Sequence, residues 1–590
     1  MGSATTRRQG VVVVGGLVAL SVCWFLFFGT WWLNSDGSTY LGTGRSALDG
    51  LGFRLPDGGA PAWWNRPVYP LLIALPSRFG GGIGASIWMS RIPLMLAAPV
   101  LAAGALRLGR SVPAAALAGL VAIAQPWTLL AGGSNLVPDG LASVVTVGAV
   151  LAASVGVTSS TPRARMGWFA AAVACLVLAS LTKQTGAAGF LLVGIVVWNG
   201  LARPPRSMVI TALALEGVAV FAALVLANGA PEVGLSDLPR AFVDRISVGV
   251  FPGSPAIVVA AAISLLLVAW ALPRATQPLP LAGLTVTVAA VALGVYASGS
   301  GLQMRNAAML PYGVALLVGA LVAEQATGGR WSRGPRILLG AVLVLSLVAG
   351  ADARAYSASE VSERNWDSNA TRGVADFLVA HHADGSTGCT LDYCSFYWLA
   401  AEQVELRLLP QYSARPTAQS VAGLAFGQRT GFRGPTRASP PCTGTPLVVT
   451  KSDEGFGAIF ECPLLRDIRS EHLGYVVVSG SGADDTFDAV RLIPYLSSNP
   501  AFRLVYSTPM SAWPHVAAVY RVVGEPRPVH GALSYYSAAA YDALPGDHGA
   551  GGAELLDGDC YAETIRADLT SPTHGPATAR GTGHAGCVNQ

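Results

Sequence analysis

Charged side chains at the ends of apolar segments have the types that a group transfer at a membrane surface needs. Two are acids, Asp36 in "WWLNSDGSTYLG" and Asp139 in "NLVPDGLAS". Three are bases, Arg91 in "WMSRIPLML", Lys183 in "LASLTKQTGAAG" and Arg305 in "GSGLQMRNAAMLP". A carboxylate can take the proton of an acceptor hydroxyl, and cations stabilise a departing phosphate. The set predicts transfer of a sugar from a polyprenyl phosphate, with inversion by one direct displacement.

Each of these residues also has a purely structural interpretation. Asp36 and Asp139 have the residue type and position of helix caps. Arg91, Lys183 and Arg305 have side chains long enough to reach lipid headgroups while their stems stay in the apolar layer, and Arg305 also fits a structural ion pair. Because ionisable groups in membrane spans are costly and usually functional, the five together favour the functional interpretation.

The composition requires a membrane protein. The 590 residues are 52% hydrophobic and only 12% charged, against about 25% charged in a soluble chain. The arginines come in small clusters between apolar runs rather than on one concentrated basic face, which excludes nucleic acid as a partner. Lysine is almost absent, since Lys183 and Lys451 are the only two.

Apolar runs of the length that crosses a bilayer, roughly 20 residues, recur through the first 350 positions. We expect about eleven spans from these runs. They are 11–33, 84–106, 112–130, 137–157, 167–182, 186–199, 208–227, 254–272, 279–298, 307–323 and 337–350. The pair 167–182 and 186–199 also fits a re-entrant hairpin.

Arginine collects in alternate connections between these runs, as it does on the cytoplasmic side of membrane proteins. The N-terminus, with Arg7 and Arg8, is therefore expected in the cytoplasm, and the chain after residue 350 outside. The first run is not expected to be a cleaved signal peptide, because it continues through Trp31 and Trp32 into an aromatic interface belt. The charged set then lies on the extracytoplasmic face.

The cysteines support this orientation. Of eight in total, Cys23 and Cys175 lie in apolar runs and the other six lie in the tail. An even number in a polar domain suits an oxidising compartment. Proximity in sequence suggests disulfides between Cys389 and Cys394, Cys442 and Cys462, and Cys560 and Cys587, although other pairings remain open.

The chain divides into a transmembrane domain (1–350), an extracytoplasmic α/β domain (351–525) and a Gly/Pro-rich extension (526–590). In the second, strands are expected at 445–450, 474–480, 502–507 and 515–523, and helices at 371–382 and 486–500. "VSGSGADD" (478–485) is an incomplete dinucleotide loop, so a plain turn is expected. His381 and His382 point to different sides of a helix and make a poor metal pair.

These motifs, in their order, resemble the GT-C glycosyltransferases, in particular the protein O-mannosyltransferase and aminoarabinose transferase group. "SDGSTYLGTGRSALDGLGF" with "NRPVYPLLIAL" is similar to the first outer loop of that group, and "SRIPLML", "VPDGL", "LTKQTG" and "RNAAMLPYGVALL" are similar to its later motifs. The resemblance covers about residues 10–350. It does not extend to the tail beyond 352.

The resemblance implies roles for individual residues. Asp36 would be the catalytic carboxylate, and Asp139 would lie near the acceptor or support the first loop. Arg91, Lys183 and Arg305 would bind the donor phosphate. Tyr40, Arg66 and Tyr69, which lie within the matching loop motifs, would contact substrate. Many relatives have Asp-Glu where this chain has Asp36-Gly37, which puts any role of a second carboxylate there in doubt.

The sequence thus predicts a membrane glycosyltransferase, a hexosyl- or pentosyltransferase, with a lipid-phosphate-linked donor and a glycan, lipid or protein acceptor in the cell envelope. No cofactor is expected, and a divalent metal shared by Asp36 and Asp139 is not favoured. Two alternatives remain. A glycolipid transporter or flippase would show internal repeats and broken midplane helices, which are not seen. A non-catalytic assembly or sensor protein would not need so many spans.

Overall fold

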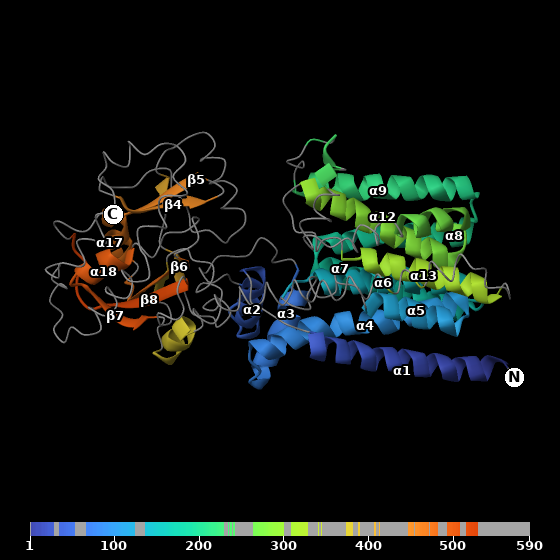
Figure 1. Ribbon diagram of the computed structural model, residues 1–590, viewed down its shortest axis with the longest axis horizontal. Coiled ribbons are helices and arrows are strands. Elements are labelled where there is room, and N and C mark those ends of the chain that lie inside the picture. Colours follow the sequence, from blue (N-terminus) through green and yellow to red (C-terminus); the bar gives the residue numbers. More distant parts are fainter. Residues whose placement is uncertain are drawn as a thin grey trace. The chain divides into compact units, whose positions relative to one another are not determined.

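The structure is a computed structural model of the whole chain, and it divides into two compact units (Figure 1). The first unit comprises Met1–Trp31 and Asn65–Val361, and the second comprises Trp32–Trp64 and Ser362–Gln590. The described residues are 2–28, 35–53, 66–123, 136–228, 234, 236–238, 240–241, 264–299, 308–327, 340, 344, 373–381, 387–389, 406–408, 412–413, 446–452, 455–470, 472–481, 492–507 and 515–528.

The first unit is a bundle of apolar helices. Its elements are α1 (Gly2–Phe28), α3 (Val68–Ala74), η1 (Leu75–Phe79), α4 (Ile83–Gly109), α5 (Val112–Ile123), α6 (Asp139–Thr158), α7 (Pro162–Thr182), η3 (Gln184–Ala188), α8 (Gly189–Ala202), α9 (Arg206–Asn228), Ser264–Arg274 with η5 (Leu272–Arg274), α12 (Pro278–Gly299) and α13 (Leu310–Thr327). Within the described residues, seven helices are long and apolar enough to cross a membrane.

Seven of the eleven predicted spans correspond to described helices long and apolar enough to cross a membrane. Within the described residues, the spans expected at 112–130, 254–272 and 307–323 are represented by the shorter apolar helices Val112–Ile123, Ser264–Arg274 and Leu310–Ala326. The span expected at 84–106 is α4, and the span expected at 137–157 is α6. The runs expected at 167–182 and 186–199 are both long enough to cross, as Pro162–Thr182 and Gln184–Ala202. Most of the runs expected at 254–272 and 337–350 lie outside the described residues.

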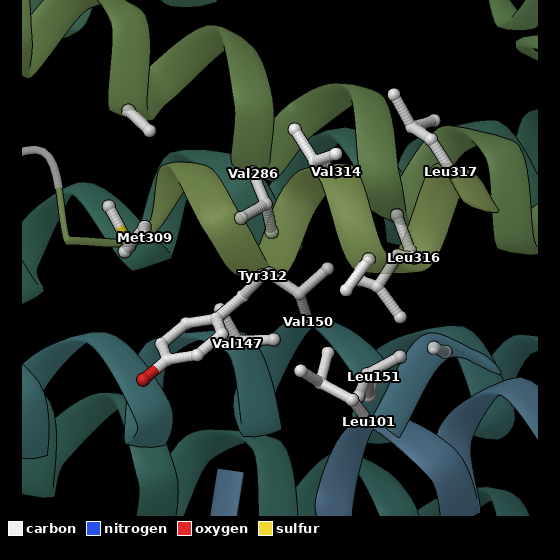
Figure 2. Packing of buried hydrophobic residues seen from close by; sticks show 14 of the residues in the cluster. Leu101, Val147, Val150, Leu151, Val286, Met309, Tyr312, Val314, Leu316 and Leu317 are labelled. Atoms are coloured by element: carbon white, nitrogen blue, oxygen red, sulfur yellow. The ribbon is translucent and has the colours of Figure 1, made fainter. Parts of the chain in front are cut away.

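Two helices, α6 and α12, lie inside the bundle. In each of these helices, 83% of the most apolar stretch is buried within the protein, whereas in α7 the buried share is 17%. Leu101 of α4, Val147, Val150 and Leu151 of α6, and Leu316 of α13 are among the residues of the shared core (Figure 2). Small residues let these helices approach closely: a Cβ added at Gly104 would meet the Leu151 side chain at 2.7 Å.

An ion pair fastens Ser264–Arg274 to α13. The Arg274 guanidinium donates from Nε to Glu324 Oε2 at 2.6 Å and from Nη2 to Glu324 Oε1 at 2.9 Å. The same guanidinium lies 4.6 Å from the Trp270 ring centroid. Arg274 lies in one of the arginine-bearing connections that the sequence predicts on the cytoplasmic side. Its bidentate contact holds the ends of the two helices together.

The second unit contains α2 (Ser35–Leu48) and the tail domain. A five-stranded mixed sheet has the order β2-β1-β6-β8-β7, and a separate three-stranded antiparallel sheet has the order β3-β5-β4. The strands are β1 (Thr387–Cys389), β2 (Leu406–Leu408), β3 (Tyr412–Ser413), β4 (Pro446–Ser452), β5 (Gly455–Phe460), β6 (Tyr475–Ser481), β7 (Phe502–Ser507) and β8 (His515–Val522). The predicted α/β class is confirmed, with all four expected strands present.

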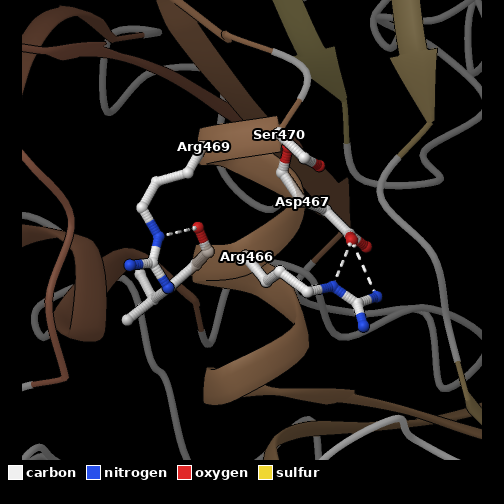
Figure 3. Close-up of polar contacts among 5 residues, drawn as sticks. Arg466, Asp467, Arg469 and Ser470 are labelled. Carbon is white, nitrogen blue, oxygen red and sulfur yellow. Dashed lines mark hydrogen bonds and ion pairs between the residues drawn. The ribbon is translucent and has the colours of Figure 1, made fainter.

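Two helices of the tail pack beside these strands, α17 (Glu461–Ser470) and α18 (Leu492–Ser498). On α17, the Arg466 guanidinium pairs with Asp467 at 2.9 Å, and Arg469 Nε donates to the Leu465 carbonyl (Figure 3). The buried Tyr495 of α18 donates its hydroxyl to Glu461 Oε1 at 2.9 Å. Burial, and then the negative charge of Glu461, raise the pKa of Tyr495 above its ordinary value.

Three sequence predictions for the tail extend beyond the described residues. Each expected disulfide includes a cysteine outside the described residues. This is Cys394 in the first pair, Cys442 in the second, and both Cys560 and Cys587 in the third. Of the turn expected at 478–485, the strand β6 occupies the residues up to Ser481, and 482–485 lie outside the described residues, as does the first part of the helix expected at 486–500. A helix does cover 373–380, within the range expected at 371–382.

Candidate functional site

The centre of the candidate site is an ion pair between Lys183 Nζ and Asp139 Oδ1. Asp139 is buried and occupies the first turn of α6, and Lys183 follows the last residue of α7. The N-cap of α6 is Pro138, and no side chain caps that helix. The Asp139 carboxylate therefore pairs with Lys183 rather than capping the helix by a hydrogen bond. The Lys183 ammonium in turn contacts this carboxylate.

A tight turn between α7 and α8 positions Lys183. The Lys183 backbone is extended, with φ −153° and ψ 145°, and its N–H donates to the Ala179 carbonyl at 3.0 Å. The Gly186 N–H then closes the turn on the Lys183 carbonyl at 2.9 Å. A Cβ at Gly186 would overlap the backbone of Ala179. Only glycine fits at this close approach, so "TKQTG" is the local cause of the Lys183 geometry.

The short helix α3 links this pair to α4 through two side-chain hydrogen bonds. Arg66, just before α3, donates from Nη2 to Gln184 Oε1 at 2.9 Å. Tyr69, which is 1% exposed, shares a hydrogen bond of 2.9 Å with Ser90 of α4. Asp139, Lys183, Arg66 and Tyr69 therefore gather at one end of the bundle, although 118 positions separate Arg66 from Gln184.

Arg91 is next to Ser90 but lies in an aromatic setting. Its guanidinium carbon is 4.9 Å from the Trp88 ring centroid and 5.8 Å from that of Phe25 near the end of α1. Only 2% of Arg91 is exposed. The side chain is thus enclosed by α1 and α4, in a cation–π arrangement that offsets part of the cost of burying the charge.

Three of the expected site residues are not placed in this cluster. Asp36 belongs to the first turn of α2, and its side chain lies outside the described residues, as does the whole of Arg305. Tyr40 is on α2 and is half-buried. Because α2 belongs to the second compact unit, the distance from Asp36 to Lys183 stays a prediction.

Gln184, Ser90 and Glu216 are polar residues that the sequence interpretation did not single out. Gln184 and Ser90 are hydrogen-bond partners of expected site residues. The available signal for them was their position in the sequence, directly beside Lys183 and Arg91. Glu216 is 1% exposed in the middle of α9, and neither carboxylate oxygen has a hydrogen-bond partner among the described residues. An acid inside a predicted span was itself a sufficient signal.

The described residues include no group of three or more His, Cys, Asp or Glu side chains arranged to hold a metal ion. The cluster offers instead a lysine held by one carboxylate, an arginine held by an amide, and a buried tyrosine hydroxyl. Such a set suits recognition of an anionic or hydroxyl-rich group at the end of a helical bundle.

The fold defines a multi-pass membrane protein with an α/β domain at its C-terminal end. No known protein-family model matches the chain, and no curated protein sequence matches it either. Among solved structures, the chain is similar to ArnT from Cupriavidus metallidurans in the apo state, with a TM-score of 0.51 and 16% identity over 89% of this chain and 100% of that one. A second structure of that protein, bound to undecaprenyl phosphate, gives a TM-score of 0.49 and 14% identity over 88% of this chain and 99% of that one. This similarity confirms the fold expected from the sequence, a polytopic helical membrane domain followed by a C-terminal α/β domain.

Proposed function

We propose that this chain is a membrane glycosyltransferase that moves a sugar from a polyprenyl-phosphate donor to a hydroxyl acceptor on the extracytoplasmic face. The observation that carries the proposal is the buried Asp139–Lys183 pair, joined through Gln184 and Arg66 to α3, in a fold similar to that of ArnT. The orientation rests on the arginine pattern of the connections.

The proposed reaction needs one base and a set of cations. Asp36 accepts the proton of the acceptor hydroxyl, whose oxygen forms a bond to the anomeric carbon while the bond from that carbon to the phosphate oxygen breaks. The departing polyprenyl phosphate takes the electron pair, and its charge is stabilised by Lys183, Arg305 and Arg91. Attack opposite the leaving group inverts the anomeric centre.

The buried cluster supports particular roles within that scheme. Lys183 is oriented before the donor arrives, because Asp139 and the Gly186 turn hold it. Arg66, just before α3, is held by Gln184, and Tyr69 of α3 is held by Ser90, so both side chains are fixed at the site end of the bundle. Pre-oriented charge lowers the reorganisation that a transfer step requires. The acceptor is a glycan, a lipid or a protein of the cell envelope.

The deciding experiment compares Asp36→Asn with Asp49→Asn, a second acid of the same segment, in protein reconstituted with lipid-linked sugar donors. We expect Asp36→Asn to lose turnover by a factor of about 10² or more while donor binding is retained. Asp49→Asn should keep both. Turnover by Asp36→Asn at the rate of the unmodified protein would remove the base assignment. Donor movement across the bilayer without any transfer would favour a transporter instead.

A further inference from the structure

Two arginines stand directly opposite each other on neighbouring strands of the tail sheet. In the register of β7 and β8, Arg503 pairs with Arg521, and in that of β6 and β8, Arg521 pairs with Tyr475. Directly paired residues of antiparallel strands project from the same face of a sheet. Tyr475, Arg521 and Arg503 therefore form one row across three adjacent strands. These strands are β6, β8 and β7 (Figure 1). We call this row the arginine row.

The arrangement is electrostatically unfavourable without a ligand. Like charges directly opposite each other destabilise an antiparallel pair, and opposed residues there have Cα atoms only about 4.5–5.5 Å apart. Both arginines are exposed, and among the described residues neither guanidinium takes part in a side-chain hydrogen bond or an ion pair. The one acid within 515–528, Glu525, is engaged by Arg527 at 2.6 Å.

From this row we infer a binding site for an anionic sugar, one that carries a phosphate or a carboxylate. Two guanidinium groups at this spacing can hold one oxyanion between them by paired N–H donors. Tyr475 follows in the same row and is half-buried, so it offers an aromatic surface and a hydroxyl next to the charged group. A bare anion would use the arginines alone, whereas a sugar uses the whole row. The site does not depend on the proposed transferase activity.

A membrane surface is a less suitable occupant of the same row. Binding to anionic lipid takes several basic residues and adds about 1 kcal/mol for each one near the surface. The row offers two cations on one strand pair, with a tyrosine at their side. This geometry matches one small charged group better than a plane of headgroups.

The test measures calorimetric binding of glucose 6-phosphate, glucuronate, glucose and inorganic phosphate to the full chain in phosphatidylcholine nanodiscs. We expect both anionic sugars to bind more tightly than glucose or phosphate. Arg503→Ala and Arg521→Ala should each weaken binding about tenfold or more, as for loss of a charge-assisted hydrogen bond. Arg527→Ala, which removes the same charge from an arginine already paired with Glu525, should change it less than twofold.

Stability provides a second measurement. Without ligand, Arg503→Ala and Arg521→Ala should leave the unfolding temperature unchanged or raise it, because each removes a like-charge contact. An equal loss of affinity in Arg527→Ala would overturn the proposal, since binding would then follow net charge. Phosphate binding as tightly as the sugars would also overturn it, as would a preference for phosphatidylglycerol vesicles over either sugar.

Discussion

The carboxylate of Asp139 and the ammonium of Lys183 form an ion pair between the start of α6 and the end of α7, although 44 positions separate the two residues. Only 3% of the Asp139 side chain and 17% of the Lys183 side chain are exposed. If either side chain were removed, water could therefore not fully solvate the charge of its partner. This relationship makes the pair both a structural element and a pre-oriented cation.

The pair predicts strong coupling between its two members. Asp139→Asn or Lys183→Met should each lower the free energy of unfolding by about 3–5 kcal/mol, since each leaves one buried charge without its partner. The double variant should cost much less than the sum of the two. Thermal unfolding in detergent, analysed as a double-mutant cycle, measures this coupling. Additive effects of the two changes would show that the pair contributes nothing.

The turn at Gly186 predicts a position-specific glycine requirement. Gly186→Ala should destabilise the protein by about 1–3 kcal/mol, because the new Cβ overlaps the Ala179 backbone and must displace it. Gly194→Ala on α8 is the matched control, since nothing lies within 4 Å of a Cβ there. That change should be neutral or stabilising by about 0.5–1 kcal/mol. Equal unfolding temperatures for the two variants would contradict the prediction.

The bond between Arg66 and Gln184 predicts an effect on donor handling. Gln184→Ala should raise the donor KM more than it lowers kcat, because Arg66 loses the amide that orients its guanidinium. Gln277→Ala changes the same residue type at an exposed position next to α12 and should leave both constants unchanged. If Gln184→Ala lowers kcat alone, Arg66 acts in the transition state rather than in binding.

Tyr495 predicts a loss of tail stability at alkaline pH. Burial and the Glu461 carboxylate raise the pKa of Tyr495 above its ordinary value of 10.0. The unfolded chain therefore loses this proton first, so the stabilisation is complete below about pH 10 and declines as the pH rises further. Tyr495→Phe should have a shallower decline, although it gives up the bond to Glu461. Unfolding temperatures from pH 8 to 11 compare the two, and parallel curves would exclude Tyr495 as the titrating group.

The sequence predicted the helices of the membrane unit well, because a bilayer imposes both length and apolarity on each span. The same reasoning missed α2, whose stretch "SDGSTYLGTGRSAL" is rich in Gly, Ser and Thr and has no continuous apolar run. It also missed α17 and the strands β1, β2, β3 and β5, which are short or polar. Short elements depend on neighbours that a local pattern does not contain.

The sequence predicted several residues of the candidate site, but not the ion pair and hydrogen bonds that join them. The charge and position of Asp139 and Lys183 were visible, whereas their pairing follows from how α6 and α7 pack. Gln184 and Ser90 carry no charge, so they stand out only once Arg66 and Tyr69 are seen beside them. Glu216 was missed although an acid inside an apolar run is a signal by itself, because the run was judged by its mean hydropathy, which one acid barely changes.

The short connection 159–161 between α6 and α7 affects how the chain enters the bilayer during biogenesis. The two helices form an antiparallel hairpin with opposite charges at its open end. If that end is translocated, as the arginine pattern indicates, it can cross without net charge, because Asp139 and Lys183 balance each other while Arg163 and Arg165 stay at the connection. We expect Lys183→Ala to reduce insertion of an isolated 136–190 segment by microsomes, because Asp139 must then cross unpaired. Equal insertion of both segments would show that the charges cross independently.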